Sequence, residues 1–143
     1  MKFSTKDRYA LRLMVELANH APDEYVPLKE ISERQEISLK YLEQIMTPLS
    51  RAGLVVSGRG SQGGYRLART ADQYTAGEIL RAIEGELVPI PCLEHGAEDC
   101  PRRGECHTIT FWSGLNQVIN RYVDSVTLED LRQQPLGADD YSI

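Results

Sequence analysis

The feature that most constrains this chain is a run of short amphipathic segments near its start, each with its own start and stop signals. The first extends from Ser4 to about His20, where apolar residues recur every three or four positions, as on one helical face. Ser4 followed by Asp7 resembles a capping box, and Ala21 with Pro22 would end the helix. With 143 residues, the chain is expected to form one compact domain or a small domain with an appendage.

Two further helices with a tight turn between them are predicted next. Pro27 favours the start of a two-turn helix that ends near Gln35. Ser38 is a good N-cap for a second helix, which Gly53 would close. Its expected buried side consists of Leu39, Leu42, Ile45, Met46 and Leu49. Pro48 predicts a kink or a break within this helix, because proline cannot donate to the Gln44 carbonyl.

A β-hairpin is predicted directly after this helix-turn-helix pattern. Residues 54–56 form a short apolar strand, residues 65–67 form the return strand, and the turn between them is rich in glycine. Thr75 with Glu78 then resembles a second capping box, for a helix that ends at Gly85.

The second half of the chain contains a long loop followed by helices. Periodicity is lost from Glu86 to Glu105, and loops of this length are usually functional or disordered. A long amphipathic helix follows, and Thr127 starts a shorter one. The apolar residues of the long helix are Ile109, Trp112, Leu115, Val118, Ile119 and Tyr122. The expected fold class is mostly α with a small β-hairpin wing: a winged helix-turn-helix domain plus a long helix.

Charge is distributed unevenly along the chain. Residues 1–85 carry 12 basic and 11 acidic side chains, whereas residues 86–143 carry 4 and 10. Within residues 39–71 the balance is reversed, because five cations face the single acid Glu43. The cations of this basic island are Lys40, Arg51, Arg59, Arg66 and Arg69. It is the one stretch suited to a polyanion such as DNA.

The second helix of the helix-turn-helix is the expected DNA-reading element, because a major groove admits one α-helix. Glutamine pairs with adenine, glutamate accepts from cytosine, and lysine and tyrosine hold phosphates. The hairpin tip would reach phosphates or the minor groove. The candidate DNA-binding residues are Ser38, Lys40, Tyr41, Glu43, Gln44, Arg51, Arg59, Ser61 and Gln62.

Three cysteines lie close together in the loop. Cys92, Cys100 and Cys106 have the spacing C-x7-C-x5-C and end at the start of the long helix, whose dipole favours thiolates. Zinc would need a fourth donor, normally in a C-x2-C knuckle, which is missing. An iron–sulfur cluster tolerates wider spacing but also needs four ligands. Three redox-active or inert thiols are the alternative.

Several functional classes are disfavoured. No cysteine–histidine or serine–histidine–aspartate arrangement is evident and no phosphate loop is present, so an enzyme is not expected. There is no membrane-spanning segment and no secretion signal, which together with the odd number of cysteines predicts a cytoplasmic protein.

Four sequence blocks then carry a resemblance to a known family. They are KFSTKDRYAL at residues 2–11, ISLKYLEQ at 37–44, AGLV at 52–55 and RGSQGGY at 59–65. The chain resembles the IscR/NsrR/CymR family of bacterial winged-helix regulators over nearly its whole length, including TAGEI at 75–79 and VTLEDL at 126–131. The resemblance implies a homodimer on a pseudo-palindromic operator in double-stranded DNA, with the helix that carries Trp112 crossing to the partner.

The same resemblance divides the chain into three parts. Residues 1–85 would bind DNA, residues 86–106 would form a cysteine-bearing sensor loop, and residues 107–143 would form the dimerisation helix and a C-terminal helix or tail. Family contacts with DNA correspond to Ser38, Tyr41, Glu43, Gln44 and Arg59. Lys40 stands where related members have a small polar residue, so the resemblance leaves the exact operator sequence open.

In the family, cysteines matching Cys92, Cys100 and Cys106 hold an iron–sulfur cluster, of the 2Fe–2S or 4Fe–4S type. A histidine soon after the last cysteine, or an acid near the N-terminus of the other subunit, completes the ligand set. Here Ile109 stands at the usual histidine position, so His107 and Asp7 are the first candidates for the fourth ligand. An exogenous thiol or water comes next, and His95 and Glu105 are further candidates. Members without these cysteines sense another protein, so the alternative is a cluster-free regulator controlled by a metabolic enzyme or by thiol oxidation.

Overall fold

The structure is a computed structural model that describes residues 3–60, 63–95 and 101–135. Its helices are α1 Thr5–Ala18, α2 Leu28–Gln35, α3 Leu39–Arg51, α4 Ala76–Glu84, α5 Ile109–Ser125 and α6 Leu128–Arg132. Its strands are β1 Val55–Gly58 and β2 Gly64–Leu67. The predicted fold class, mostly α with a small hairpin wing, is confirmed. None of the helices in the described ranges combines the length and apolarity that crossing a bilayer requires.

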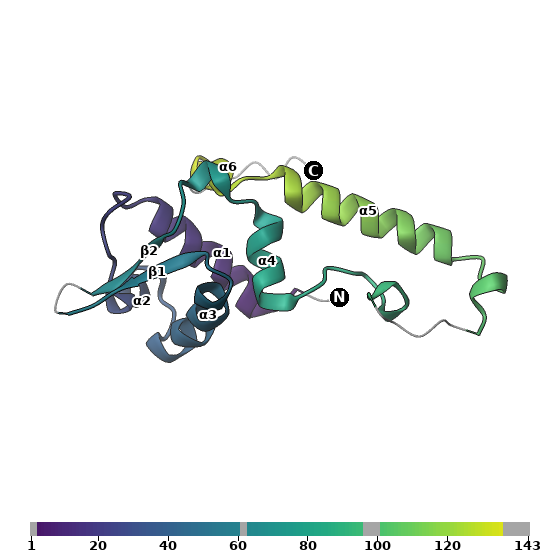
Figure 1. Cartoon of the computed structure of the whole chain (residues 1–143), viewed down its shortest axis with the longest axis horizontal. Helices are drawn as coiled ribbons and strands as arrows, with labels where there is room; N and C mark the ends of the chain where they lie inside the picture. Colours follow the sequence, from purple (N-terminus) through teal and green to yellow (C-terminus); the bar gives the residue numbers. More distant parts are fainter. Residues whose placement is uncertain (1–2, 61–62, 96–100, 136–143) are drawn as a thin grey trace.

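The molecule consists of a compact body and an arm. The body contains α1 to α4, the hairpin and α6, and the arm contains residues 86–95 and 101–125. Figure 1 shows that the chain leaves α4, runs outward, and returns along α5 to α6 on top of the body. The hairpin and α3 lie at the end of the body farthest from the outer end of this arm.

Polar side chains fix where the helices begin. The predicted Ser4–Asp7 capping box is present at α1, and the Ser38 hydroxyl accepts from the Tyr41 amide at 3.2 Å at the start of α3. The second box is only half formed. Thr75 caps α4, but the Glu78 carboxylate instead accepts from Arg69 at 2.9 Å.

The core lies where α1, α3 and α4 meet. It is formed by fully buried side chains that include Leu13, Met14, Ile31, Leu42, Ile45, Leu49, Tyr74, Ile79 and Leu128. The expected burial of Leu39 is wrong, since its side chain is 42% exposed. Leu39 is the first residue of α3, where a side chain points back toward the exposed turn rather than along the buried face.

Of the two outcomes expected at Pro48, the break is wrong, because α3 continues through Pro48 to Arg51. Pro48 lies close to the end of the helix, so the bond that it cannot donate to Gln44 is one of the last in the ladder. The following turn is retained, with the Ala52 amide donating to the Pro48 carbonyl at 3.0 Å.

The hairpin is held to the body by a third segment. Val26 pairs with Tyr65 in both directions, at 2.8 and 2.9 Å, beside the β1–β2 ladder. Gly64 has a φ of 153° and lies so close to this segment that a side-chain carbon would meet the Val26 carbonyl. Glycine at this position therefore lets the wing pack against the chain before α2.

Tyr74 joins the hairpin to the helices through its hydroxyl. The ring is fully buried, and the hydroxyl donates to the Leu54 carbonyl at 2.6 Å. It also accepts from the backbone amides of Ala68 and Arg69, at 2.9 and 3.0 Å. One buried oxygen thus forms hydrogen bonds with three backbone groups at the base of the hairpin, where the chain enters β1 and leaves β2.

Replacing Tyr74 by phenylalanine is expected to lower the free energy of unfolding by about 2 kcal/mol, because three backbone groups lose a buried partner. Urea unfolding followed by circular dichroism measures the change. The control is Tyr25→Phe, whose hydroxyl has no hydrogen bond in the described part of the chain and whose cost should stay below about 0.5 kcal/mol. Equal costs for the two variants would contradict this role of Tyr74.

Candidate nucleic-acid interface and cysteine loop

The outer face of α3 is polar and open. Lys40, Glu43, Gln44, Thr47 and Arg51 are all exposed and recur at intervals of three or four residues, so they share one side of the helix. The opposite side carries the buried core residues of α3. Packing of the apolar side against α1 and α4 therefore fixes which side chains α3 presents to solvent. Ser38, the N-cap of α3, is also exposed.

Tyr41 differs from its neighbours because it is half-buried. Its ring meets Tyr9 of α1 edge-on, with centroids 5.6 Å apart, and Arg12 lies over the Tyr9 ring at 5.2 Å. The Tyr41 ring is therefore anchored to α1, which leaves it less freedom than the exposed residues of the same helix.

Only part of the basic island is available at the surface. Arg66 lies over the Tyr25 ring at 5.3 Å and donates to the Leu67 carbonyl at 3.2 Å. Arg69 binds Glu78 and lies over the Tyr74 ring at 4.3 Å. Lys40, Arg51 and Arg59 are exposed, and they extend from α3 to the hairpin tip. Two other candidates, Ser61 and Gln62, lie outside the described residues.

Leu39 is a functional candidate that sequence reasoning missed. It is an exposed leucine on the first turn of α3, beside Lys40, and apolar side chains there can meet the methyl group of thymine. Periodicity assigned it to the core because it fits the spacing of the buried residues. The signal that could have found it is its place directly after the N-cap, where the helix has only begun.

The loop places two of the three cysteines at its surface. Cys92 lies in a 3₁₀ turn, Pro91–Leu93, and Cys106 precedes α5; both are free and exposed. Cys100 lies outside the described residues. Cys106 Sγ is 3.4 Å from the Thr108 hydroxyl, and this hydrogen bond, followed by those of nearby backbone amides, lowers the pKa of the thiol. A thiolate at the start of a 17-residue helix is a suitable ligand for a soft metal.

The fourth ligand of a cluster is not identified by geometry. His107 is exposed next to Cys106. Asp7 is only 1% exposed, and one of its carboxylate oxygens accepts from the Ser4 amide at 2.7 Å as part of the capping box. Its other oxygen, Oδ1, is buried without a hydrogen bond among the described residues, and the neighbouring Asp7 carboxylate raises the pKa of Glu84. Within the described ranges no three histidine, cysteine or acidic side chains converge on a metal position.

A charged cluster at the end of α1 positions the first helix of the helix-turn-helix. Glu16 is almost buried, and it accepts from Gln35 of α2 at 2.9 Å and contacts His20 at 2.9 Å. Arg34 adds a contact at 3.4 Å, and the second ring nitrogen of His20 meets Glu24. Burial disfavours the charged forms, but these partners outweigh it, so the pKa of Glu16 is lowered and that of His20 is raised.

Comparison with known proteins identifies the family. Residues 3–134 match the Rrf2 family model, described as an iron-dependent transcriptional regulator. The chain belongs to the Rrf2 family. It is 42% identical to the HTH-type transcriptional regulator IscR of Aliivibrio salmonicida, over 92% of this chain and 77% of the relative. It is also 37% identical to protein rrf2 of Nitratidesulfovibrio vulgaris, over 92% and 87%.

Solved structures agree with this assignment. The structure of CymR, the global cysteine regulator of B. subtilis, has a TM-score of 0.74 at 39% identity and covers 92% of this chain and 96% of that one. T. potens IscR has a TM-score of 0.73 at 37% identity, with coverage of 96% and 94%. This Rrf2-family chain is therefore a DNA-binding transcriptional regulator of the IscR type and not an enzyme, as the sequence predicted.

The Glu16–His20 cluster predicts a pH dependence of stability. Because the pKa of His20 is raised by folding, its contribution is complete below about pH 6.5, the unfolded value, and is lost as the pH rises through the folded pKa. Glu16 has the opposite sign, and its contribution is lost as the pH falls. The contribution of His20 to the unfolding free energy should thus decline as the pH rises above about 6.5. Urea unfolding of His20→Gln should show a flatter profile, and His95→Gln, at an exposed histidine, should match the parent chain; identical profiles for all three would contradict the assignment.

Proposed function

We propose that this regulator acts as a homodimer on a pseudo-palindromic operator and that an iron–sulfur cluster in the residue 86–106 loop controls its affinity. The single observation that supports the proposed homodimer is the exposure of α5. None of its 17 residues, all of them described, is buried. An amphipathic helix without a buried residue is unusual in a folded domain and marks an interaction surface.

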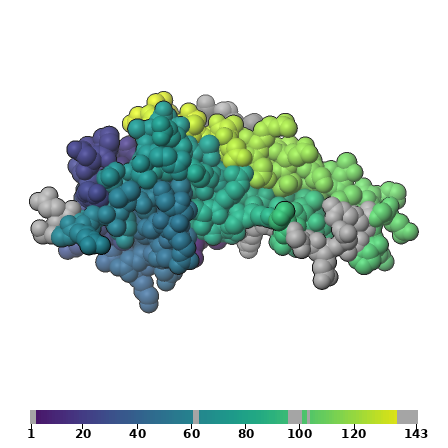
Figure 2. Space-filling model, viewed as in Figure 1, coloured from purple at the N-terminus to yellow at the C-terminus, as the bar shows by residue number. Residues whose placement is uncertain are grey.

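The exposed apolar residues of α5 form a stripe suited to a second copy of the chain. Phe111, Val118 and Tyr122 are 64%, 62% and 67% exposed, and half-buried Leu115 lies between them at helical spacing. The separation of seven residues from Phe111 to Val118 and the steps of four beside it are typical of helices that pair side by side. Figure 2 shows α5 as a ridge along one side of the molecule.

The exposed outer face of α3 supports DNA binding by this dimer. Lys40, Glu43 and Gln44 on its outer face would enter the major groove, with Tyr41, Ser38 and Arg51 beside them, and Arg59 at the wing tip would contact a phosphate. In a twofold dimer the two recognition helices must lie about 34 Å apart, one turn of duplex. We assign residues 1–85 to DNA binding, the loop to sensing, and residues 107–143 to dimerisation and the C-terminal segment.

The described cysteines fit a cluster by their chemistry. Cys92 and Cys106 are exposed, unpaired thiols, and the pKa of Cys106 is lowered. Together with Cys100 they would supply three thiolate ligands, and His107 or Asp7 of the partner subunit would supply the fourth. When bound, an iron–sulfur cluster supplies a centre that responds to iron supply and oxidants. One end of the loop contacts α5 where Leu87 accepts from Asn120, and the other end, at Cys106, directly precedes α5. Ordering of the loop by a cluster would therefore constrain the position of α5.

Replacing Arg59 by alanine is expected to weaken operator binding and to reduce the slope of log K against log salt by about one unit, because one phosphate contact is lost. Fluorescence anisotropy on an operator selected from random duplexes, at several salt concentrations, measures both values. The matched control is Arg132→Ala in α6, which should leave the slope unchanged. An unaltered slope and affinity for Arg59→Ala would place Arg59 away from the DNA.

Anaerobic purification should yield a brown protein with visible absorbance, iron and sulfide. Cys106→Ala should bleach it, because a cluster loses one of its thiolate ligands. Visible spectra and iron analysis of the parent chain and the variant make the measurement. A colourless parent chain with no iron, three titratable thiols and operator binding indifferent to iron would instead support the cluster-free alternative, in which a metabolic enzyme or thiol oxidation controls binding.

A further inference from the structure

The arm is attached to the body at one end by its backbone. The Ala76 amide donates to the Val126 carbonyl at 2.8 Å, and the Leu128 amide donates to the Tyr74 carbonyl at 3.0 Å. Thr75 and Thr127 form the bridge between these two bonds. These contacts hold the chain where α5 ends and α6 begins. None of them involves the opposite end of α5. They therefore form a pivot for the arm.

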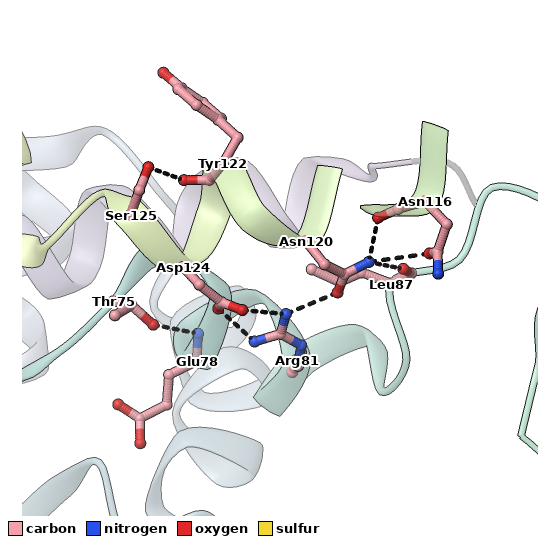
Figure 3. Close-up of polar contacts among 9 residues, drawn as sticks. All are labelled: Thr75, Glu78, Arg81, Leu87, Asn116, Asn120, Tyr122, Asp124 and Ser125. Atoms are coloured by element: carbon pink, nitrogen blue, oxygen red, sulfur yellow. Dashed lines mark hydrogen bonds and ion pairs between the residues drawn. The ribbon is translucent and has the colours of Figure 1, made fainter. Parts of the chain in front are cut away.

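A second attachment lies within the last two turns of α5, next to this pivot. Arg81 of α4 donates to both carboxylate oxygens of Asp124, at 2.7 and 3.0 Å, and to Asn120 Oδ1 at 2.7 Å (Figure 3). The guanidinium is a rigid planar fork, so three bonds to two successive turns of α5 fix the direction of that helix relative to α4. We call Arg81, Asn120 and Asp124 the α4–α5 latch.

The latch also contacts the start of the cysteine loop. The Asn120 amide group donates to the Leu87 carbonyl at 2.9 Å, and Leu87 itself is buried. Asn120 therefore connects α4, α5 and the start of the loop (Figure 3). Its amide also donates to the Asn116 carbonyl at 2.9 Å, which holds the side chain against the helix.

The close approach of α5 to α4 depends on a glycine. A side-chain carbon on Gly77 of α4 would meet Asp124 Oδ1, Arg81 and the Val123 side chain. The absence of a side chain at this position lets Asp124 reach Arg81. The pKa of Asp124 is lowered because Arg81 donates to its carboxylate.

The latch is suited to setting an angle rather than to supplying stability. The Arg81 and Asp124 side chains are 35% and 47% exposed, and ion pairs so open to water contribute little to unfolding free energy. Geometry amplifies their effect. At 1.5 Å per residue, α5 is about 25 Å long, so a tilt of about 10° at the pivot moves its far end by about 4 Å.

We propose that Arg81 is a positioning residue that sets the angle between the DNA-binding body and the dimerisation helix, and through it the half-site spacing that the dimer accepts. The inference rests on the proposed homodimer. Each subunit contributes one latch. In a twofold dimer a change of the angle therefore occurs in both subunits, and both changes alter the distance between the two recognition helices. Loss of the latch leaves the pivot and the core intact and widens the range of angles.

The test compares operators of different half-site spacing. The parent chain should bind the selected operator well and bind operators with one base pair inserted or removed much more weakly, because each step moves and rotates one half-site. For Arg81→Gln the ratio of these affinities should fall by about fivefold or more. Arg81→Lys, which keeps the charge but loses the fork, should recover part of the ratio.

The control is Arg132→Gln, which removes another arginine–carboxylate pair, with Glu129, but one that lies within α6. It should retain the spacing ratio of the parent chain. Asp124→Asn removes the charged acceptor of the Arg81 hydrogen bonds and should reduce the affinity ratio as Arg81→Gln does. With two latch variants the test stays decisive if one of them does not fold. Thermal midpoints and the dimer mass are measured alongside.

The outcomes distinguish the proposed dimer from the role of Arg81. A parent chain without any spacing preference would overturn the proposed dimer, and the inference with it. A parent chain with a clear preference that Arg81→Gln and Asp124→Asn both retain, as folded dimers, would overturn the role of Arg81 alone. A reduced ratio in both latch variants, with Arg132→Gln unchanged, supports it.

Discussion

Burial of one side of α3 against α1 and α4 is the constraint on which the rest of the structure depends. Leu42, Ile45 and Leu49 are completely buried there, and each large apolar side chain removed from water stabilises the fold by about 1.5–3 kcal/mol. Because helix geometry is rigid, this burial also determines which residues lie on the other side. The polar face of α3 is therefore held in place by packing, and its orientation does not depend on contacts made by its own exposed side chains.

The arm has a different physical character. It has no core of its own, since α5 contains no buried residue, and its attachment combines backbone bonds near Val126 with the exposed α4–α5 latch. Such a joint fixes a direction at little gain in stability. A body that is rigid and an arm whose angle is set by a few polar contacts would make binding sensitive to small changes in the loop. The two ends of that loop lie at Leu87, beside Asn120, and at Cys106, before α5.

Much of this architecture follows from local sequence signals. The caps at Ser4 and Ser38 and the turn signal at Gly53 predicted helix limits well, because caps are local and need no tertiary partner. Leu39 and Pro48 show where local rules fail. Apolar spacing does not reveal that the first turn of a helix extends beyond the core, and propensity does not reveal that packing carries a helix past a proline near its end. Capping chemistry likewise missed that Glu78 has a better partner in Arg69.

The candidate site was only partly accessible to such reasoning. Charge counting found the basic island. It could not show that Arg66 packs on an aromatic ring, or that Arg69 packs on another ring and pairs with an acid. The latch was missed, because Arg81 and Asp124 are distant in sequence and each resembles an ordinary solvated charge. Contacts of this kind depend on the tertiary arrangement, which periodicity and spacing do not encode.

The central claim is that two copies of α3 occupy successive major grooves of one duplex. Hydroxyl-radical footprinting of the purified chain on its selected operator tests it most directly. The account predicts two protected stretches on the same face of the DNA, with centres about 10 base pairs apart or a multiple of that distance. A single protected stretch, or protection without helical phasing, would contradict it.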